Sequence, residues 1–122
     1  MPNYSILVVD DEQFILSSIT ELLRSEGYNV SAASNGREAL AVLGSATFDL
    51  VISDLKLPDG VNGNDILRFA KSQAGGTKVL ILTAYADLLH AKAAKRDGAD
   101  EFLSKPYEVE DMLHTVKRLL EK

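Results

Sequence analysis

The chain has 122 residues and a mass of 13.3 kDa, which fits one domain with a single core. With 46% hydrophobic and 25% charged residues, its composition is globular and excludes the disordered, fibrous and membrane classes. A net charge of −5 and a pI near 4.9 argue against nonspecific nucleic-acid binding, which depends on clustered Lys and Arg, so any DNA contact is expected from another domain.

The first half of the chain alternates short apolar runs with amphipathic segments. Residues 4–9 are branched and almost continuously apolar, which predicts a strand covered on both faces. A helix follows and ends near Gly27, with apolar residues at helical spacing: Ile15, Ile19, Leu22 and Leu23. Residues 28–33 alternate more and predict a strand nearer the sheet edge, before a helix that begins after Asn35-Gly36.

The second half repeats this alternation. Apolar runs predict three further strands, at 49–53, 78–82 and 99–104. They are separated by a loop at 57–62, a helix around 66–70, an alanine-rich helix at about 87–96 with a weak apolar stripe, and a strongly amphipathic last helix at 109–120. Strands that alternate with helices through short loops predict a doubly wound α/β fold: a parallel sheet with helices on both faces.

Four of the five predicted strands end at residues that can handle a phosphoryl group or a metal ion. These residues are Asp10 and Asp11 after the first strand, Asp54 after the third, Thr83 after the fourth and Lys105 after the fifth. The carboxyl ends of parallel strands share one edge of the sheet, where ligands bind. We therefore expect the five side chains to converge in one crevice.

Four short motifs contain these residues: Val8-Val9-Asp10-Asp11-Glu12, Ile52-Ser53-Asp54-Leu55-Lys56-Leu57-Pro58, Leu82-Thr83-Ala84 and Phe102-Leu103-Ser104-Lys105-Pro106. Together, and in this order, they resemble the receiver domain of two-component response regulators over the whole chain. The resemblance implies one receiver domain at 1–122, a flavodoxin-like five-stranded sheet of order 2-1-3-4-5, and a cis Lys105-Pro106 bond.

The resemblance also implies roles for the acidic residues. Asp54 is expected to accept a phosphoryl group from a sensor histidine kinase or a phosphotransfer protein, forming an acyl phosphate. Mg²⁺ is the expected cofactor, bound directly by Asp11, Asp54 and the main-chain carbonyl of Lys56, with Asp10 acting mostly through water. The three acids carry three negative charges, which a divalent cation and the ammonium of Lys105 balance.

The remaining residues are expected to connect the phosphoryl group to an output. Lys105 can pair with a phosphoryl oxygen, and the hydroxyl of Thr83 is expected to move toward it, which leaves space for Phe102 to turn inward. The expected readout face is the fourth helix, fifth strand and fifth helix, for a downstream effector or a fused output domain. A phosphorylation-dependent dimer through this face is left open. No enzymatic turnover is expected beyond self-phosphorylation and self-dephosphorylation.

Two departures from the usual family pattern stand out in the sequence. Gly63 lies one residue further from Pro58 than is usual, so the loop after Asp54 is expected to be reshaped. Two further residues, Lys56 and Tyr85, occupy positions that tune the lifetime of the acyl phosphate in the family. We hypothesise that Tyr85 shields the phosphoryl group from water.

Three other functions fit parts of this pattern. A haloacid-dehalogenase-type phosphatase also uses Asp, Thr and Lys around Mg²⁺, but its second Asp follows the nucleophile by two positions, where this chain has Glu12 after Asp10. A flavin carrier needs a phosphate-binding loop after the first strand, where the acids here would repel phosphate. A phosphorylation-independent interaction module does not explain the complete acidic set.

Cysteine content and apolar runs predict where the protein is located. Cysteine is absent, which excludes disulfides and thiolate sites and is compatible with a reducing compartment. We find no signal-peptide pattern at the start and no apolar run of the roughly 20 residues needed to span a bilayer. A cytoplasmic protein without membrane contact is therefore expected, either as a stand-alone receiver or as the amino-terminal part of a longer regulator.

Overall fold

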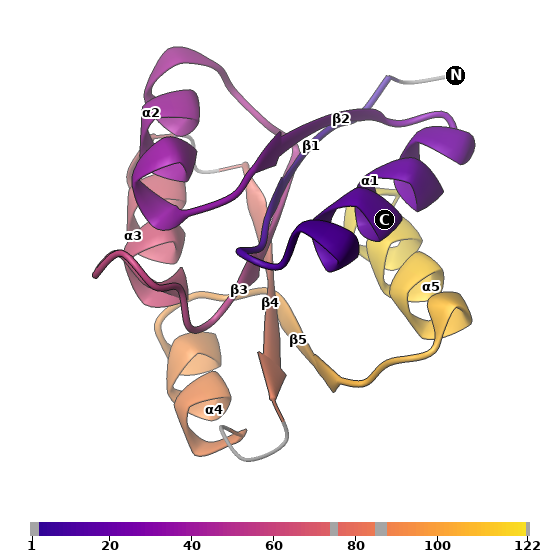
Figure 1. Ribbon diagram of the computed structural model, residues 1–122. Helices are drawn as coiled ribbons and strands as arrows, with labels where there is room; N and C mark the ends of the chain where they lie inside the picture. The colour runs from indigo at the N-terminus through magenta and orange to yellow at the C-terminus, as the bar shows by residue number, and fades with distance from the viewer. Residues whose placement is uncertain (1–2, 74–75, 85–87, 122) are drawn as a thin grey trace.

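The computed structural model describes residues 3–73, 76–84 and 88–121. Strands and helices alternate along these residues (Figure 1). The strands are β1 (Ser5–Val9), β2 (Asn29–Ala33), β3 (Leu50–Asp54), β4 (Lys78–Ala84) and β5 (Glu101–Lys105). The helices are α1 (Gln13–Ser25), α2 (Gly36–Ser45), α3 (Gly63–Gln73), α4 (Leu88–Arg96) and α5 (Val109–Leu120).

All five strands are parallel and lie in the order β2-β1-β3-β4-β5. The register pairs Val9 with Ser53 and Asp54 with Leu82, so the carboxyl ends of β1, β3 and β4 reach the same edge of the sheet. The predicted doubly wound α/β fold and strand order are confirmed. The Lys105-Pro106 peptide bond is cis, as expected.

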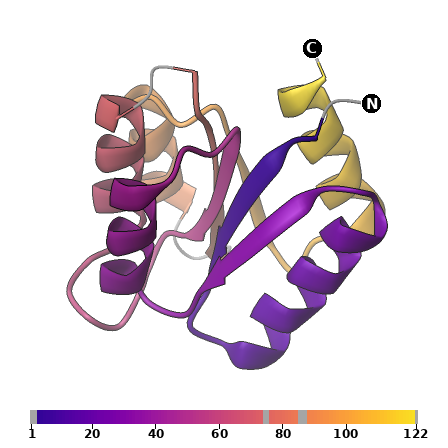
Figure 2. The ribbon, with the colours of Figure 1, turned by 90° about the horizontal axis from the view of Figure 1, so that it is seen from above.

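The helices form two layers around the sheet, with α1 and α5 on one face and α2, α3 and α4 on the other (Figure 2). Alternate residues of β1 face opposite layers, as the period of a strand requires: Ile6 and Val8 pack toward α1 and α5, while Leu7 and Val9 pack toward the other layer. Complete burial of such side chains contributes about 1.5–3 kcal/mol each to folding. The sheet is therefore a rigid platform for the residues at its carboxyl edge.

The central and edge strands differ in burial. Every residue of β3 is buried, whereas β2 is exposed at three of its five positions, as expected for an edge strand. The fifth predicted strand is less buried than an apolar run suggests: β5 is only half-buried along its length, because it is the other edge strand. Among the side chains of α4 that are described, Ala94 alone is fully buried, in agreement with its weak apolar stripe.

Several strand boundaries differ from the predicted ones by one or two residues. Asp54 is the last residue of β3 rather than the first residue of a loop, and β4 continues through Thr83 to Ala84. The fifth strand begins at Glu101 and not at Ala99, because the Ala99 N–H donates to Ala94 O and so closes the end of α4. Asp54, Thr83 and Lys105 consequently belong to the strands themselves, whereas Asp10 and Asp11 directly follow the end of β1.

One lysine fastens the amino-terminal edge of the sheet to α3. Lys71 Nζ donates to Thr77 O at 2.7 Å and to Asp100 Oδ2 at 2.8 Å. The same carboxylate oxygen accepts from the Val79 N–H at 2.7 Å. The starts of β4 and β5 are thereby joined to one helix end.

In the part of the chain that is described, no helix is both long and apolar enough to cross a bilayer.

Candidate functional site at the carboxyl edge of the sheet

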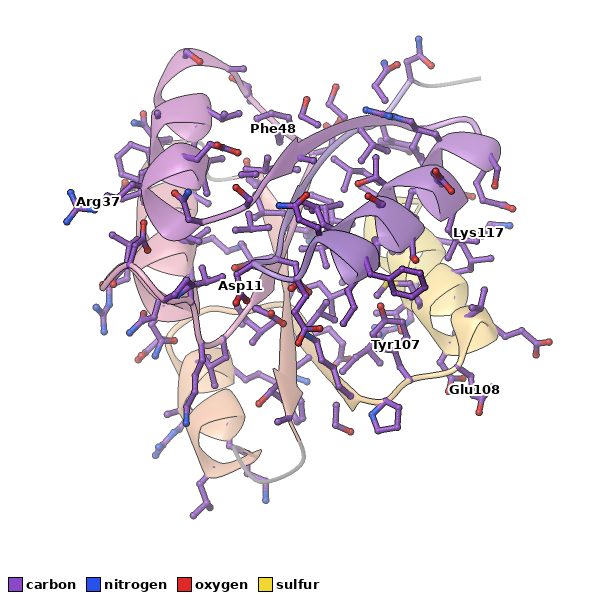
Figure 3. The ribbon with its side chains drawn as sticks, viewed as in Figure 1. Asp11, Arg37, Phe48, Tyr107, Glu108 and Lys117 are labelled. Atoms are coloured by element: carbon purple, nitrogen blue, oxygen red, sulfur yellow. The ribbon has the colours of Figure 1, made fainter. Side chains whose placement is uncertain are left out.

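Three carboxylates meet at the carboxyl edge of β1 and β3. One oxygen each of Asp10, Asp11 and Asp54 lies within 4.8 Å of the other two. Asp10 is completely buried and Asp54 is 7% exposed, whereas Asp11 is exposed, and Figure 3 shows Asp11 at the end of β1. These three acids, which we call the acidic cluster, lie together as the sequence predicts.

Lys105 brings a positive charge to the acidic cluster from β5. Its Nζ lies 2.6 Å from Asp54 Oδ1 and 3.2 Å from Asp10 Oδ2, and its side chain is 24% exposed. Asp10 is held further by its Oδ1, which accepts from the Glu12 N–H at 2.9 Å. Salt bridges at this depth need such additional hydrogen bonds to offset the loss of solvation. One ammonium thus serves two buried carboxylates.

The pKa of the Asp54 carboxyl is raised to about 7. Burial is the largest cause and the charge of Asp10 adds to it, while the ion pair with Lys105 acts in the opposite direction without cancelling them. The pKa of Lys105 is raised, because its contacts with Asp54 and Asp10 outweigh its own burial. One ammonium therefore does not fully offset the cost of burying the ionised Asp54 carboxyl beside Asp10.

The donor set fits a hard divalent cation. It consists only of carboxylate oxygens, which are the ligands that such ions prefer, and a further positive charge beside them would counteract the burial and the charge of Asp10 that raise the pKa of Asp54. Asp11 is exposed and so leaves the cluster accessible from solvent. The acidic cluster can therefore bind a metal ion beside a nucleophilic carboxylate.

The start of α3 makes a close backbone contact with the end of β3, beside the acidic cluster. Gly63 begins α3, and a Cβ there would lie 2.5 Å from Asp54 O and 2.8 Å from Leu55 Cα. Its N–H donates to Leu55 O at 2.8 Å. Asn62 and Asp65 each accept from the other's N–H, so a capping box fixes the helix start. Only glycine fits at position 63. The unusual spacing between Gly63 and Pro58 is visible in the sequence, but it did not indicate this close contact.

Two other predicted site residues lie at or just past the same edge, with different surroundings. Thr83 is buried, one residue beyond the partner of Asp54 on β4, and its hydroxyl donates to Ala84 O at 3.2 Å. Lys56 lies two residues past Asp54, with an exposed side chain. Tyr85 falls outside the described residues, so its proposed shielding of the site stays a hypothesis.

Two neighbours of the cluster were missed by the sequence analysis. Ser53 is fully buried, and its hydroxyl donates to Asp54 O at 2.9 Å, which fixes the end of β3. Tyr107 is half-buried; burial raises the pKa of its phenol, and the charges of Asp10 and Asp54 raise it further against the effect of Lys105. The only sequence signal for Tyr107 was its position two residues after Lys105.

Ion pairs join α4, β5 and α5 at a single carboxylate. Glu101 on β5 accepts from Lys95 of α4 at 3.2 Å and from Arg118 of α5 at 2.9 Å. Burial alone would raise the pKa of Glu101, but hydrogen bonds from the Phe102 N–H, Lys95 and Arg118 lower it. Lys95 Nζ also lies 5.9 Å from the centroid of the half-buried Phe102 ring. The expected readout face is thus a connected unit.

Comparison with known proteins agrees with this geometry. A sequence profile described as "Response regulator receiver domain" matches residues 6–117. Sporulation initiation phosphotransferase F of Bacillus subtilis is 35% identical over 120 residues, which cover 98% of this chain and 96% of that protein. The probable transcriptional regulatory protein TcrX of Mycobacterium tuberculosis is 33% identical over 97% of this chain, which spans 50% of that protein's length.

Solved structures give the same result. A receiver domain protein described as CheY-like, from Methanospirillum hungatei, superposes with a TM-score of 0.91 at 35% identity, covering 98% of this chain and 95% of that one. A receiver domain protein from Clostridium thermocellum has a TM-score of 0.90 at 37% identity, covering 97% and 94%. The fold, the acidic cluster and these similarities together show that the chain belongs to the family of response regulator receiver domains.

Proposed function

We propose that Asp54 is the phosphoacceptor of this receiver domain and that Lys105, Thr83 and the acidic cluster assist it. The observation that carries the proposal is the convergence of three carboxylates and one ammonium at the sheet edge. Asp54 lies at the centre of this group and has a strongly perturbed pKa, a property that concentrates at functional sites.

In the proposed reaction, an oxygen of Asp54 attacks the phosphorus of a phosphohistidine on a histidine kinase or phosphotransfer protein. The oxygen–phosphorus bond forms as the phosphorus–nitrogen bond breaks, and the imidazole leaves with the electron pair of the broken bond. The attack needs ionised Asp54, and the contact with Lys105 favours that form. Lys105 then pairs with an oxygen of the transferred group.

Mg²⁺ is the metal we propose for the acidic cluster. Asp11, Asp54 and the main-chain carbonyl of Lys56 would hold it, and Asp10 would act mostly through water. When bound, it offsets the negative charge that would otherwise repel the phosphodonor. The burial of Asp10 supports its indirect role, since Lys105 and the Glu12 N–H already occupy its oxygens.

Phosphorylation is proposed to change the packing of α4, β5 and α5. The Thr83 hydroxyl would exchange its bond with Ala84 O for one with a phosphoryl oxygen, and Phe102 would turn inward into the released space. The network at Glu101 supports this readout, because it makes the two helices and the strand respond as one body.

The partners follow from the same proposal. We assign a sensor kinase or phosphotransfer protein as phosphodonor, and a downstream effector or fused output domain as target. Several relatives are named as DNA-binding response regulators, such as MtrA, and this chain spans about half their length. The domain is proposed to comprise residues 1–122, to act in the cytoplasm, and to catalyse no turnover of small phosphate esters.

The proposal is tested with a small-molecule phosphodonor and intact-mass measurement. Wild-type protein with Mg²⁺ should gain the mass of one phosphoryl group, Asp54→Asn should gain none, and the matched control Asp111→Asn, exposed on α5, should behave as wild type. Omission of the divalent cation should abolish labelling. Labelling of Asp54→Asn, or sustained hydrolysis of a phosphate ester without a stable adduct, would contradict the proposal and favour a phosphatase.

A further inference from the structure

A pocket lies at the amino-terminal edge of the sheet, opposite the acidic cluster. Its volume is about 610 Å³, within the range typical of small-molecule sites, roughly 300–1,000 Å³. Residues just before β1 and β2 line it, together with the ends of α1 and α5, and Figure 3 shows Lys117 on this side of α5. Nothing in the proposed phosphoryl chemistry uses this pocket.

Two aromatic rings line the pocket. The centroids of Tyr4 and Tyr28 are 6.3 Å apart and the ring planes are tilted by 51°. Tyr28 packs on the apolar core beneath α1 and α5, so its ring is held in place. The faces of such rings carry negative electrostatic potential and attract cations within about 6 Å of the centroid.

The charged residues of the pocket also favour a cation. Two carboxylates, Glu26 and Glu121, and one ammonium, Lys117, line it, so its net charge is negative. Lys117 Nζ lies 3.7 Å from Glu26 Oε1, and the Tyr28 hydroxyl donates to Glu121 Oε2 at 3.2 Å. The pKa of Tyr28 is raised to about 12 by burial first and then by Glu121 and Glu26, which agrees with a negative potential at the rings.

We propose that this pocket binds an organic cation, an ammonium or guanidinium group carried on a short aliphatic chain. The carboxylates pair with the charged group while the two tyrosine rings contact the chain and the cation. An anion would meet two carboxylates against one ammonium, and a purely apolar ligand would leave the excess negative charge of the pocket unbalanced. The cation can come from a free amine or from a basic side chain of a peptide, which present the same chemistry.

Lys117 supplies an internal competitor for the same carboxylates. Its ammonium is half-exposed and contacts Glu26 at a distance longer than a tight ion pair. Neutralising Lys117 removes a positive charge from the pocket, and an external cation should then bind more tightly. This expectation separates a cation site from a pocket that accepts any small apolar molecule.

The test is an NMR titration that follows the ring signals of Tyr4 and Tyr28 in the full 122-residue chain. Butylamine and butylguanidine are compared with 1-butanol as the neutral analogue. A short capped peptide containing Arg is compared with the same peptide containing Gln. Variants are Glu121→Gln, Tyr28→Leu and Lys117→Gln, and Glu110→Gln, exposed at the other end of α5, is the matched control.

We expect both cations to bind at least about tenfold more tightly than 1-butanol, and Glu121→Gln and Tyr28→Leu to weaken cation binding about three- to tenfold. Lys117→Gln should strengthen it about threefold, and Glu110→Gln should leave it unchanged. Tighter binding of the small amines assigns a free-amine ligand, and tighter binding of the Arg peptide assigns a basic segment. Equal binding of cations and 1-butanol, or no effect of Glu121→Gln, overturns the proposal even if Tyr28→Leu does not fold.

Discussion

The ammonium of Lys105 lies 2.6 Å from Oδ1 of Asp54, although the two residues belong to strands that do not pair with each other. They meet because β3 and β5 flank β4, and both side chains reach across its carboxyl end. This contact crosses from the strand of the proposed phosphoacceptor to a strand of the proposed readout face. Under that proposal, it would link the chemistry of the site to the surface that reports it.

Lys105→Met should destabilise the protein. Removal of the ammonium leaves Asp10 and Asp54 close together without their cation, so we expect the free energy of unfolding at pH 8 to fall by about 1–3 kcal/mol without divalent cations. Urea unfolding of this variant beside Lys92→Met, an exposed substitution on α4, measures the effect. Equal stabilities of the two variants would show that the ion pairs contribute nothing.

Asp54→Asn should change how stability depends on pH. The pKa of Asp54 in the folded protein, about 7, lies above its ordinary value of 3.8, so its contribution to stability is fully present below about pH 4 and is lost as the pH rises through about 7. Because Asn carries no charge, the variant should exceed wild type by about 1–3 kcal/mol at pH 8 and lose that advantage near pH 4.

Chemical denaturation at pH 4 and pH 8, without divalent cations, measures that difference. Asp111→Asn, an exposed change on α5, should track wild type within about 0.5 kcal/mol at both pH values. A destabilised Asp54→Asn at pH 8 would mean that the carboxylate is better satisfied in the fold than its burial indicates.

Gly63→Ala should lower the stability of the fold and weaken Mg²⁺ binding at the acidic cluster. An added Cβ would lie 2.5 Å from Asp54 O, so α3 must shift away from the end of β3. We expect a loss of about 1–3 kcal/mol in the free energy of unfolding and weaker Mg²⁺ binding, measured by urea unfolding and by titration.

Gly44→Ala is the matched control for that substitution. Gly44 lies in α2, and nothing lies within 4 Å of the position its Cβ would take. Alanine there should stabilise the helix by about 0.5–1 kcal/mol without affecting the metal. Similar losses in both variants would contradict the close contact at Gly63.

Glu101→Gln should loosen the readout face. The amide cannot pair with Lys95 and Arg118 as the carboxylate does, so α4 loses an electrostatic tie to β5. We expect amide hydrogen exchange within residues 92–96 to become faster and the free energy of unfolding to fall by about 1 kcal/mol. Glu110→Gln should leave the exchange of α4 unchanged; equal exchange in both variants would remove Glu101 from the network.

The order of elements and the acidic cluster could be predicted because both depend on local pattern. Apolar runs such as 49–53 specify a strand, and parallel topology then brings Asp10, Asp54 and Lys105 to one edge without any knowledge of their contacts. The resemblance to receiver domains added the strand order and the individual roles. The order of elements and the convergence of the acids needed only the spacing of apolar residues and the parallel direction of the strands.

Other features depend on distances that no pattern records. The approach of Gly63 to Asp54 O reflects how closely α3 meets the end of β3, and the network at Glu101 depends on where α4 and α5 lie over the edge strand. The half-burial of β5 likewise depends on its place at the edge of the sheet, which its own residues do not specify. Tertiary packing decides these points.

The contacts of Lys71 with Thr77 O and Asp100 have a mechanical consequence. They join β4 and β5 to α3 at the end of the sheet remote from the acidic cluster, whereas the opposite end of β5 is held through Lys105 by Asp54 and Asp10. A phosphoryl group that drew Lys105 away from these carboxylates would release that end of β5 while the start of the strand stays anchored. Phosphoryl-driven displacement is therefore expected to pivot about Lys71.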